Sequence, residues 1–370
     1  MNNNELIRWI ALSLIPGLGA RGASQLVRAL GSPSAVFSAS TAELFAQGLC
    51  RDAALGMRLP HILPEAEEIL KKCDRKRIGV LSLDSADYPR LLKEIHDPPV
   101  VLYWQGSLEA LAQPGVAIVG TRRPTAYGLH AAQKIASELA ARSLAIFSGL
   151  ARGIDTAAHL GTLKAGGRTA AVLGSGVDVI YPRENLKNSQ AILERGGTLV
   201  SEYPPETFPA PQNFPVRNRI ISGLALGVVV VEASEYSGSL ITARMALDQN
   251  RELFAVPGNI SSETSSGPNR LIQQGAKLLQ SWEDVVEELP FEVRRSALLA
   301  PPKSVQQELP MISPEEGELL RLLRPDVTTH IDELHGWAGK PPGWILDALL
   351  DLEMKGYVRQ VAGKKFLRTG

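Results

Sequence analysis

Cysteine is nearly absent from this 370-residue chain, which contains only Cys50 and Cys73. Two cysteines provide neither a disulfide framework nor a zinc-binding set, so we expect a cytoplasmic protein without a metal site. Long hydrophobic runs are also missing, because the longest apolar stretches are too short and too broken by glycine and proline to span a bilayer. The first residues, Met1 to Glu5, are polar and lack the order of a signal peptide.

The chain has no excess of either charge, with 39 Lys and Arg against 39 Asp and Glu. Residues 1–113, 114–290 and 291–370 are each neutral when they are counted separately. No part of the chain is basic enough to hold a nucleic acid by its total charge, so a polyanion requires a local group of arginines. Hydrophobic residues make up 44%, which excludes a disordered chain, and the length predicts two or three domains.

The first 73 residues read as short helices. The segment from Ile15 to Ala20 (IPGLGA) joins two stretches of helical periodicity, and Gly17 and Gly19 permit a tight turn with exposed amides. This layout is typical of a helix-hairpin-helix, in which such amides can meet a phosphate. Because the turn contains no Lys or Arg, a module that only packs helices is the alternative.

Residues 74–290 alternate strands, glycine turns and helices. Continuous apolar runs rich in β-branched residues are typical of parallel strands that are buried on both faces. We expect strands at residues 78–83, 100–104, 116–120, 144–149, 168–174, 197–202, 226–233 and 252–258. The alternation predicts an α/β fold with a doubly wound, mostly parallel sheet, whose ligands lie beyond the carboxyl ends of the strands.

The remaining residues divide into a linker and a small module. Residues 291–313 have mixed polarity and three prolines, which suits a linker. Residues 308–370 carry 8 basic and 10 acidic side chains, which argues against strong nonspecific binding of duplex DNA. We expect three helices near residues 315–323, 329–338 and 342–355, followed by a hairpin-like tail at 356–368. This is the order of elements in a winged-helix domain.

Arginines and small residues occur together in several turns, most of them just past a strand. Glycine and serine let backbone amides approach an anion, and the helix that follows adds the positive end of its dipole. The arginine guanidinium matches the oxygens of a phosphate, and several converging arginines are costly to bury without anions. We therefore predict a phosphate-binding edge of the sheet that contains Arg122, Arg123, Arg152, Arg217 and Arg219.

Other interpretations of these turns stay open. Individual arginines can instead pair within the protein with Asp155, Glu202 or Glu232, and Arg152 is the first candidate because Asp155 is close in sequence. The dinucleotide and P-loop glycine signatures are absent. No nucleophile elbow surrounds Ser148, so a hydrolytic triad with His159 is not expected.

Aromatic residues make up only 5% of the chain, yet several stand beside these turns. An aromatic ring next to a phosphate-binding arginine suits single-stranded nucleic acid, whose bases stack at about 1–3 kcal/mol each. Phe214 is the best stacking candidate. For Tyr127 and Tyr181, packing in the core is as good an explanation as contact with a base. Phe208 and Tyr236 are the other aromatic residues beside these turns.

Eight short motifs occur in a fixed order between residues 116 and 258. They are VAIVGTR, SGLARGIDTAAH, IYP, SEYP, FPVRNRII, VEA, SGSLITA and VPG. In this order they resemble the DNA processing protein A (DprA/Smf) family over about residues 80–285. The resemblance implies a helix-hairpin-helix or SAM-like domain, a Rossmann-like core, a linker and a winged-helix domain, with expected bounds of 1–73, 74–290, 291–313 and 314–370.

The resemblance also implies a function. Such proteins are cytoplasmic, bind single-stranded DNA without strong sequence preference, protect incoming strands, and help to load the RecA recombinase during natural transformation. They form homodimers through the Rossmann-like core, with no established catalytic activity and no nucleotide cofactor. Carried over by motif, with Arg123 added, the DNA-binding positions are Gly120, Thr121, Arg122, Arg123, Ser148, Gly149, Arg152, Phe214, Arg217, Asn218, Arg219, Ser237 and Gly238.

Two other functions remain as alternatives. Nucleoside-monophosphate hydrolases have a related Rossmann-like core with a Pro-Gly-Gly-x-Gly-Thr-x-x-Glu signature. The corresponding turn here, Ser237 to Ala243, lacks the glutamate, which counts against an enzyme. The third possibility is a scaffold that docks a recombinase without touching nucleic acid.

Overall fold

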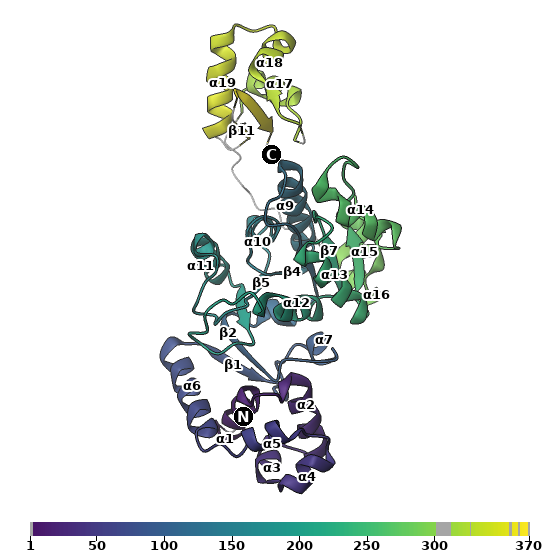
Figure 1. The fold of residues 1–370 in the computed structure, drawn as a ribbon. Coiled ribbons are helices and arrows are strands. Elements are labelled where there is room, and N and C mark those ends of the chain that lie inside the picture. The colour runs from purple at the N-terminus through teal and green to yellow at the C-terminus, as the bar shows by residue number, and fades with distance from the viewer. Residues whose placement is uncertain (1–2, 301–311, 326, 355–356, 362, 369–370) are drawn as a thin grey trace. The chain divides into compact units, whose positions relative to one another are not determined.

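The structure is a computed structural model that describes residues 3–300, 312–325, 327–354, 357–361 and 363–368 (Figure 1). The chain divides into two units, one of residues 1–123 with 132–303 and one of residues 124–131 with 304–370. Among the described residues, no helix combines the length and the apolar character that a membrane crossing requires.

Six helices open the first unit, as the sequence predicts. They are α1 (Asn3–Leu14), α2 (Gly19–Leu30), α3 (Pro33–Ser38), α4 (Thr41–Ala46), α5 (Arg51–Gly56) and α6 (Ile62–Lys76). Gly17 and Gly19, in the turn between α1 and α2, have φ angles of 76° and 64°, in the left-handed region that side chains with a Cβ disfavour. The tight turn expected here is therefore present.

The helical segment shares its hydrophobic core with the sheet that follows. Trp9 and Cys73 belong to the same buried cluster as Leu102 and Val228. The expected boundary at residue 73 falls inside α6, so this helix carries the chain from one part of the core into the next.

A nine-stranded sheet forms the centre of the first unit. Its strands are β1 (Gly79–Ser82), β2 (Val101–Gly106), β3 (Gly115–Val119), β4 (Ala145–Ser148), β5 (Thr169–Val172), β6 (Thr198–Ser201), β7 (Gly227–Val230), β8 (Glu252–Ala255) and β9 (Lys277–Leu278). They lie in the order β1-β2-β6-β5-β4-β3-β7-β8-β9. In this sheet only the pairs β1–β2 and β2–β6 are antiparallel, so the expected mostly parallel α/β sheet is confirmed.

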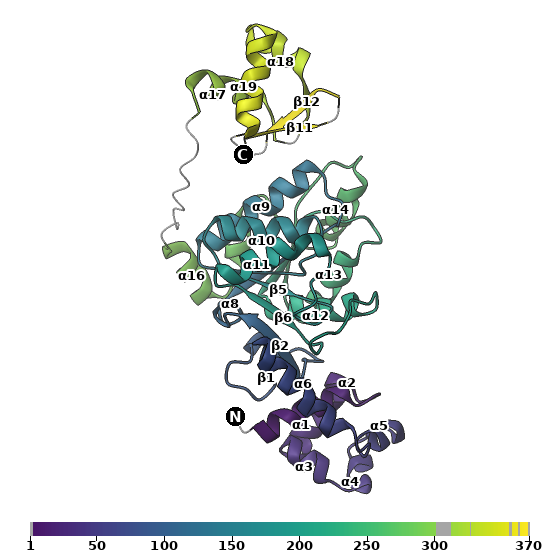
Figure 2. The same ribbon diagram turned by 90° about the vertical axis from the view of Figure 1, so that its left-hand side faces the viewer.

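Helices connect these strands and cover both faces of the sheet. They are α7 (Arg90–Lys93), α8 (Glu109–Ala112), α9 (Ala126–Ala141), α10 (Ile154–Lys164), η1 (Arg183–Asn185), α11 (Leu186–Glu194), α12 (Asn213–Leu224), α13 (Gly238–Asp248), η2 (Glu263–Ser265), α14 (Ser266–Gln273), α15 (Trp282–Glu288) and α16 (Phe291–Leu299). Right-handed crossovers place α10 and α11 on one face and α12 and α13 on the other. Both α10 and α12 pack against β3, β4 and β5, and Figure 2 shows α10 and α11 together on the near side of the sheet.

The path of the chain through the sheet reverses beside β3. It moves outward from β3 through β4 and β5 to β6, and then returns past β3 to β7, β8 and β9. At such a reversal the loops at the carboxyl ends of neighbouring strands separate and leave a crevice, where doubly wound sheets bind ligands.

Part of the segment expected as a linker is helical. Residues 291–299 form α16, which packs against α15 and buries Ala297. The linker expected over 291–313 is corrected to this extent, because its first residues form a helix that packs against α15. Residues 301–311 lie outside the described residues.

The second unit contains a winged-helix domain, as expected. Its elements are α17 (Pro314–Leu322), β10 (Thr329–His330), α18 (Ile331–Ala338), α19 (Pro342–Met354), β11 (Val358–Val361) and β12 (Lys365–Arg368). Leu319, Leu334, Leu349 and Phe366 belong to its core. The helix expected at 329–338 begins two residues later, because Thr329 and His330 pair with β12 as a short strand.

Candidate functional site

A cleft of about 620 Å³ opens beyond the carboxyl ends of β3 and β7. Its walls are the turn after β3, the first half of α12 and the first turn of α13. The cleft therefore lies where the strand order reverses, as the doubly wound topology requires. Of the thirteen positions expected from sequence, it brings together Gly120, Thr121, Arg122, Arg123, Phe214, Arg217, Asn218, Ser237 and Gly238.

A smaller hollow of about 60 Å³ adjoins the cleft. Gly149 and Arg152 line it, and Arg122, Phe214 and Arg217 line both spaces. Two expected positions, Ser148 and Arg219, line neither of them.

The turn after β3 places two arginines at the surface. Arg122 and Arg123 are exposed, and neither forms an ion pair with a described residue. The turn itself is fixed from below, because the amide of Thr121 donates to the carbonyl oxygen of Glu232 at 2.7 Å. Gly120 is required here, since a Cβ would lie 2.6 Å from the side chain of Ile154.

Two aromatic rings lie beside Arg122. Its guanidinium carbon is 5.5 Å from the centre of the Phe214 ring, within the range of a cation–π interaction. The ring of Tyr181 is 5.7 Å from that of Phe214 and is 47% exposed. The sequence left Tyr181 open between core packing and the site, and the structure places it at the cleft.

Arg217 forms the floor of the cleft rather than its rim. It is only 4% exposed, and its Nη1 donates to the carbonyl oxygen of Val172. Burial lowers the pKa of Arg217 to about 10, an effect that the nearby Asp155 carboxylate opposes. Gly149 lies directly against the guanidinium and leaves no room for a Cβ.

Asp155 lies in the first turn of α10, and its carboxylate reaches back to the turn after β4, where the sequence predicted free amides. Its Oδ2 accepts from the amides of Gly149 at 3.1 Å and of Ala151 at 3.3 Å. Burial raises the pKa of Asp155, while the charge of Arg217 and these amides oppose the rise. Two of the predicted anion-binding amides are therefore already taken by an internal carboxylate.

Ser148 does not belong to the cleft, which corrects the sequence prediction. It is the last residue of β4 and is completely buried. Its hydroxyl donates to the carbonyl oxygen of Ile118 at 2.6 Å, so it joins two neighbouring strands.

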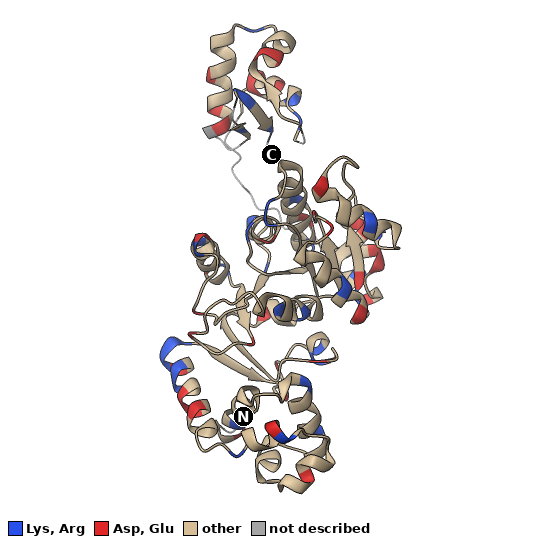
Figure 3. Ribbon diagram, viewed as in Figure 1, with Lys and Arg blue, Asp and Glu red and all other residues tan. Residues whose placement is uncertain are grey.

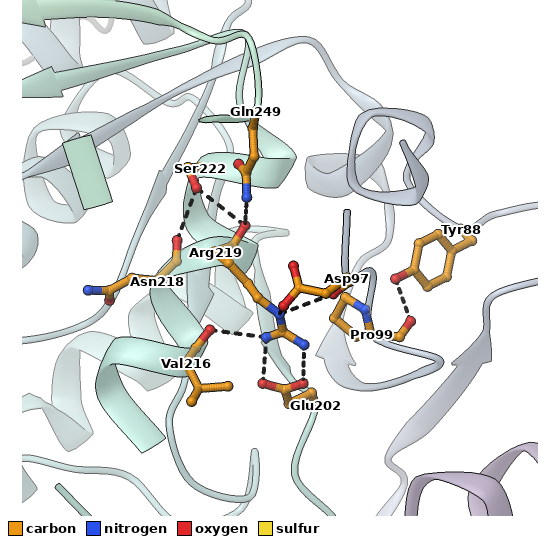
Figure 4. Close-up of polar contacts among 9 residues, drawn as sticks. All are labelled: Tyr88, Asp97, Pro99, Glu202, Val216, Asn218, Arg219, Ser222 and Gln249. Atoms are coloured by element: carbon orange, nitrogen blue, oxygen red, sulfur yellow. Dashed lines mark hydrogen bonds and ion pairs between the residues drawn. The ribbon is translucent and has the colours of Figure 1, made fainter. Parts of the chain in front are cut away.

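Arg219 is also a structural residue, as Figure 4 shows. Its Nη1 and Nη2 each lie 2.7 Å from a carboxylate oxygen of Glu202, and its Nε lies 2.9 Å from a carboxylate oxygen of Asp97. It is 6% exposed. The prediction that Arg219 lies at the phosphate-binding edge is therefore wrong. Arg219 instead pairs within the protein, with Glu202 and Asp97.

Arg152 is paired as well, but at the surface. Its Nε lies 2.7 Å from Glu184, and both side chains are more than half exposed. The sequence suggested Asp155 as the partner of Arg152, but the partner is Glu184. An exposed pair of this kind contributes little to stability, so Arg152 is free to exchange Glu184 for another anion.

The first turn of α13 closes the other side of the cleft. The hydroxyl of Ser237 caps this helix and accepts from the amide of Ser239 at 3.4 Å. Nδ2 of Asn218 donates to the carbonyl oxygen of Gly238 at 3.4 Å and so ties α12 to α13. The positive end of the α13 dipole therefore faces the cleft.

His159 lies beneath the site, completely buried. Its Nδ1 is 2.7 Å from the hydroxyl of Thr169. Burial, together with the charge of Arg217, lowers the pKa of His159 to about 3. The residue is therefore neutral and structural. Among the described residues, no three His, Cys, Asp or Glu side chains gather as a metal site would require.

Two family models match this chain, one over the region of the nine-stranded sheet and one over the winged-helix domain. A family model described as DNA recombination-mediator protein A matches residues 79–290. A second family model, described as the DprA winged helix domain, matches residues 300–364.

Curated relatives match over most of their own length. The chain is 43% identical over 259 residues to the DNA processing protein DprA of Bacillus subtilis (strain 168), covering 70% of this chain and 87% of the relative. It is 41% identical over 290 residues to the protein Smf of Escherichia coli (strain K12), covering 77% and 76%.

Two solved structures resemble this one. The X-ray structure of DNA processing protein A from Streptococcus pneumoniae has a TM-score of 0.68 and 35% identity, and the match covers 79% of this chain and 99% of that one. The Helicobacter pylori protein has a TM-score of 0.51 and 30% identity, covering 58% and 98%, and its structure concerns a single-stranded DNA binding mode.

Proposed function

Because this chain belongs to the DNA recombination-mediator protein A family, which is also called DprA, we propose that it binds single-stranded DNA in the cleft beyond β3 and β7. The phosphates contact the arginines of the rim, and the bases stack on the aromatic rings. The related Helicobacter pylori protein, whose structure concerns such a binding mode, supports this proposal.

One observation carries the proposal: exposed cations without ion-pair partners among the described residues stand beside one exposed and one half-buried aromatic ring in a single cleft. Arg122 and Arg123 supply the cations, and Phe214 and Tyr181 supply the rings. Single-stranded DNA presents a phosphate and an unpaired base at every step, which is the chemistry that this pairing recognises. A duplex keeps its bases stacked and offers only the phosphates.

The buried groups of the site support the same interpretation. Arg217 adds a positive charge from the floor, and the amino end of α13 adds another from the side. All of these groups recognise charge or flat rings rather than the edges of particular bases. We therefore expect weak sequence preference.

Binding without chemistry is the favoured mode of action. A catalytic base must be able to reach a substrate and take its proton, whereas the Asp155 carboxylate is buried and accepts from two amides. The proposal therefore favours a DNA-binding protein over the nucleoside-monophosphate hydrolase.

The wider role is inferred from the family likeness. We propose that the bound strand is protected and passed to the RecA recombinase in natural transformation or recombination, and that two chains act together through the Rossmann-like core. The relatives named as DNA processing proteins support the processing role. Joining two clefts in one dimer raises the effective concentration of the second cleft along a strand.

A titration of fluorescein-labelled oligo-dT by anisotropy tests the binding site. The Arg122→Ala variant is expected to bind about tenfold more weakly, because one phosphate contact and the cation–π contact are lost together. Arg90→Ala is the matched control, since its side chain is 91% exposed and it does not line the cleft.

Equal affinity of the wild type and the Arg122→Ala variant would contradict the proposed site. Release of free base from nucleotides by the pure protein would instead favour the hydrolase. RecA loading is tested separately, by the rate at which RecA assembles on strands that a single-strand-binding protein already covers.

A further inference from the structure

Helix α19, the third helix of the winged-helix domain, presents a face that is apolar and acidic. Leu346 and Leu350 are 53% and 56% exposed, and Asp347 and Asp351 next to them are exposed as well. Residues four apart share a side of a helix, so the leucines form one row and the aspartates an adjacent row. Residues 342–354 contain no Lys or Arg, and Figure 3 shows the acidic positions on α19.

This face does not suit duplex DNA. In helix-turn-helix proteins the corresponding helix enters the major groove, with cations close to the phosphates. Asp347 and Asp351 would repel those phosphates, and the two leucines would be left without partners. The cations of the domain include several on its hairpin rather than on α19, namely Arg359, Lys365 and Arg368.

A groove of about 580 Å³ adjoins the aspartate row of this face, on the side away from the leucines. It lies between the first turn of α17 and α19, where Trp344 and Ala348 give it an apolar wall and Glu315 adds a carboxylate. Within the described residues, neither Asp347 nor Asp351 forms an ion pair. Glu315 does have a cationic partner, because Nζ of Lys340 lies 3.6 Å from its carboxylate and 5.3 Å from the centre of the Trp344 ring. The groove thus combines an apolar wall with two aspartates that form no ion pair with a described residue.

We propose that α19 and its groove dock a basic amphipathic helix of a partner protein. The apolar stripe of that helix covers Leu346 and Leu350, as in other helix-in-groove complexes. Its Lys and Arg side chains pair with Asp347 and Asp351, which speeds association and fixes the orientation. A second copy of this chain fits poorly, because two α19 faces would bring their aspartates together.

The full-length protein is tested with a fluorescein-labelled model peptide that carries Leu and Lys at amphipathic helical spacing. The wild type is expected to bind it more tightly than a scrambled peptide of the same composition. The Asp347→Lys/Asp351→Lys variant should bind about tenfold more weakly, because two attractions become repulsions. Leu346→Ser/Leu350→Ser should weaken binding by a similar factor, and since both leucines are exposed the variant should still fold.

Asp332→Lys/Glu333→Lys is the matched control, because it makes the same charge change at exposed positions on α18. This variant should bind the peptide as the wild type does. A peptide with Glu in place of Lys should bind only the variant with lysines at positions 347 and 351. This reciprocal exchange separates recognition of charge at α19 from general attraction to an acidic surface.

Three results would overturn the proposal. The first is a peptide affinity that the changes on α19 leave unaltered. The second is displacement of the peptide from α19 by duplex DNA, which would make a nucleic acid the occupant. The third is a smaller mass by sedimentation for Leu346→Ser/Leu350→Ser, which would assign the face to a second copy of this chain.

Discussion

Replacing Arg219 is expected to destabilise the protein and to leave DNA binding by the folded molecules nearly unchanged. Arg219→Met removes the partner of the Glu202 carboxylate, whose side chain is only 15% exposed. Breaking a buried ion pair in this way costs about 3–5 kcal/mol. The free energy of unfolding in urea measures the loss, and oligo-dT anisotropy measures the affinity.

The double variant Arg219→Met/Glu202→Gln is the control for this change. It removes both charges, so most of the lost stability should return. A large loss of affinity in Arg219→Met with stability intact would instead return Arg219 to the binding site.

His159 gives the protein a dependence of stability on pH. Its pKa is about 3 in the folded protein and about 6.5 in an unfolded chain. The unfolded chain therefore binds the proton more readily as the pH falls below about 6.5, so stability is lost on acidification by up to about 1.4 kcal/mol per pH unit. Urea denaturation at a series of pH values measures this slope.

His159→Asn tests the assignment, because an asparagine amide can still donate to Thr169 but does not titrate. The variant should lose less stability than the wild type between neutral and mildly acidic pH. The same slope in both proteins would show that other groups cause the dependence.

The sequence predicts which turns come together at the candidate site. It does not predict that Arg217 and Arg219 point to different sides of α12. The convergence of the turns was predictable, because the carboxyl ends of parallel strands lie at one edge of a sheet. The sequence pattern predicts Arg217 and Arg219 in one turn, whereas both lie within α12. Two residues apart on a helix, they point about 200° apart. The partner Asp97 is 122 positions away in sequence, so no local signal reveals the pair.

A change at the N-cap of α13 is expected to affect DNA affinity without lowering the stability of the fold. Ser237→Asp replaces one good N-cap by another and places a carboxylate at the positive end of the helix dipole. The melting temperature should stay unchanged or rise slightly. Affinity for oligo-dT should fall by about fivefold or more, because the new charge repels the phosphates.

Ser32→Asp is the matched control, since Ser32 caps α3 in the same way but does not line the cleft. It should leave the affinity unchanged. Unaltered binding by Ser237→Asp would exclude the amino end of α13 from the DNA path.

Long elements that are buried on both faces are predicted from sequence more reliably than short ones. The strands from β3 to β7 were predictable because both of their faces are covered, which requires continuous apolar runs. The two-residue strands β9 and β10 are too short to produce a pattern. Helix α16 was not predicted, because nothing local in residues 291–299 shows that this segment packs against α15.

At the scale of the whole molecule, the net charge of zero limits how binding responds to salt. Attraction must come from the few cations at the cleft, chiefly Arg122, Arg123 and Arg217. Each neutralised phosphate of a single strand contributes about −0.7 to the slope of log K against log salt. We therefore expect a slope of roughly −2 for one cleft, measured by oligo-dT titrations at several salt concentrations.

A much steeper slope would show that cations beyond the cleft hold the strand. A flat response would exclude phosphate contacts altogether. Arg122→Ala should reduce the slope by about one contact, while Arg90→Ala should not change it.

The carboxylate of Asp155 has a consequence for selectivity among cellular phosphates. It accepts from the amides of Gly149 and Ala151, which a phosphate would otherwise reach, and because it is part of the same chain, a free nucleotide does not displace it simply by its concentration. Abundant metabolites such as ATP are thereby excluded from the turn after β4. A polymer that reaches several sites of the cleft at once gains contacts that a mononucleotide lacks, so under the proposed function we expect free mononucleotides to compete weakly with single-stranded DNA.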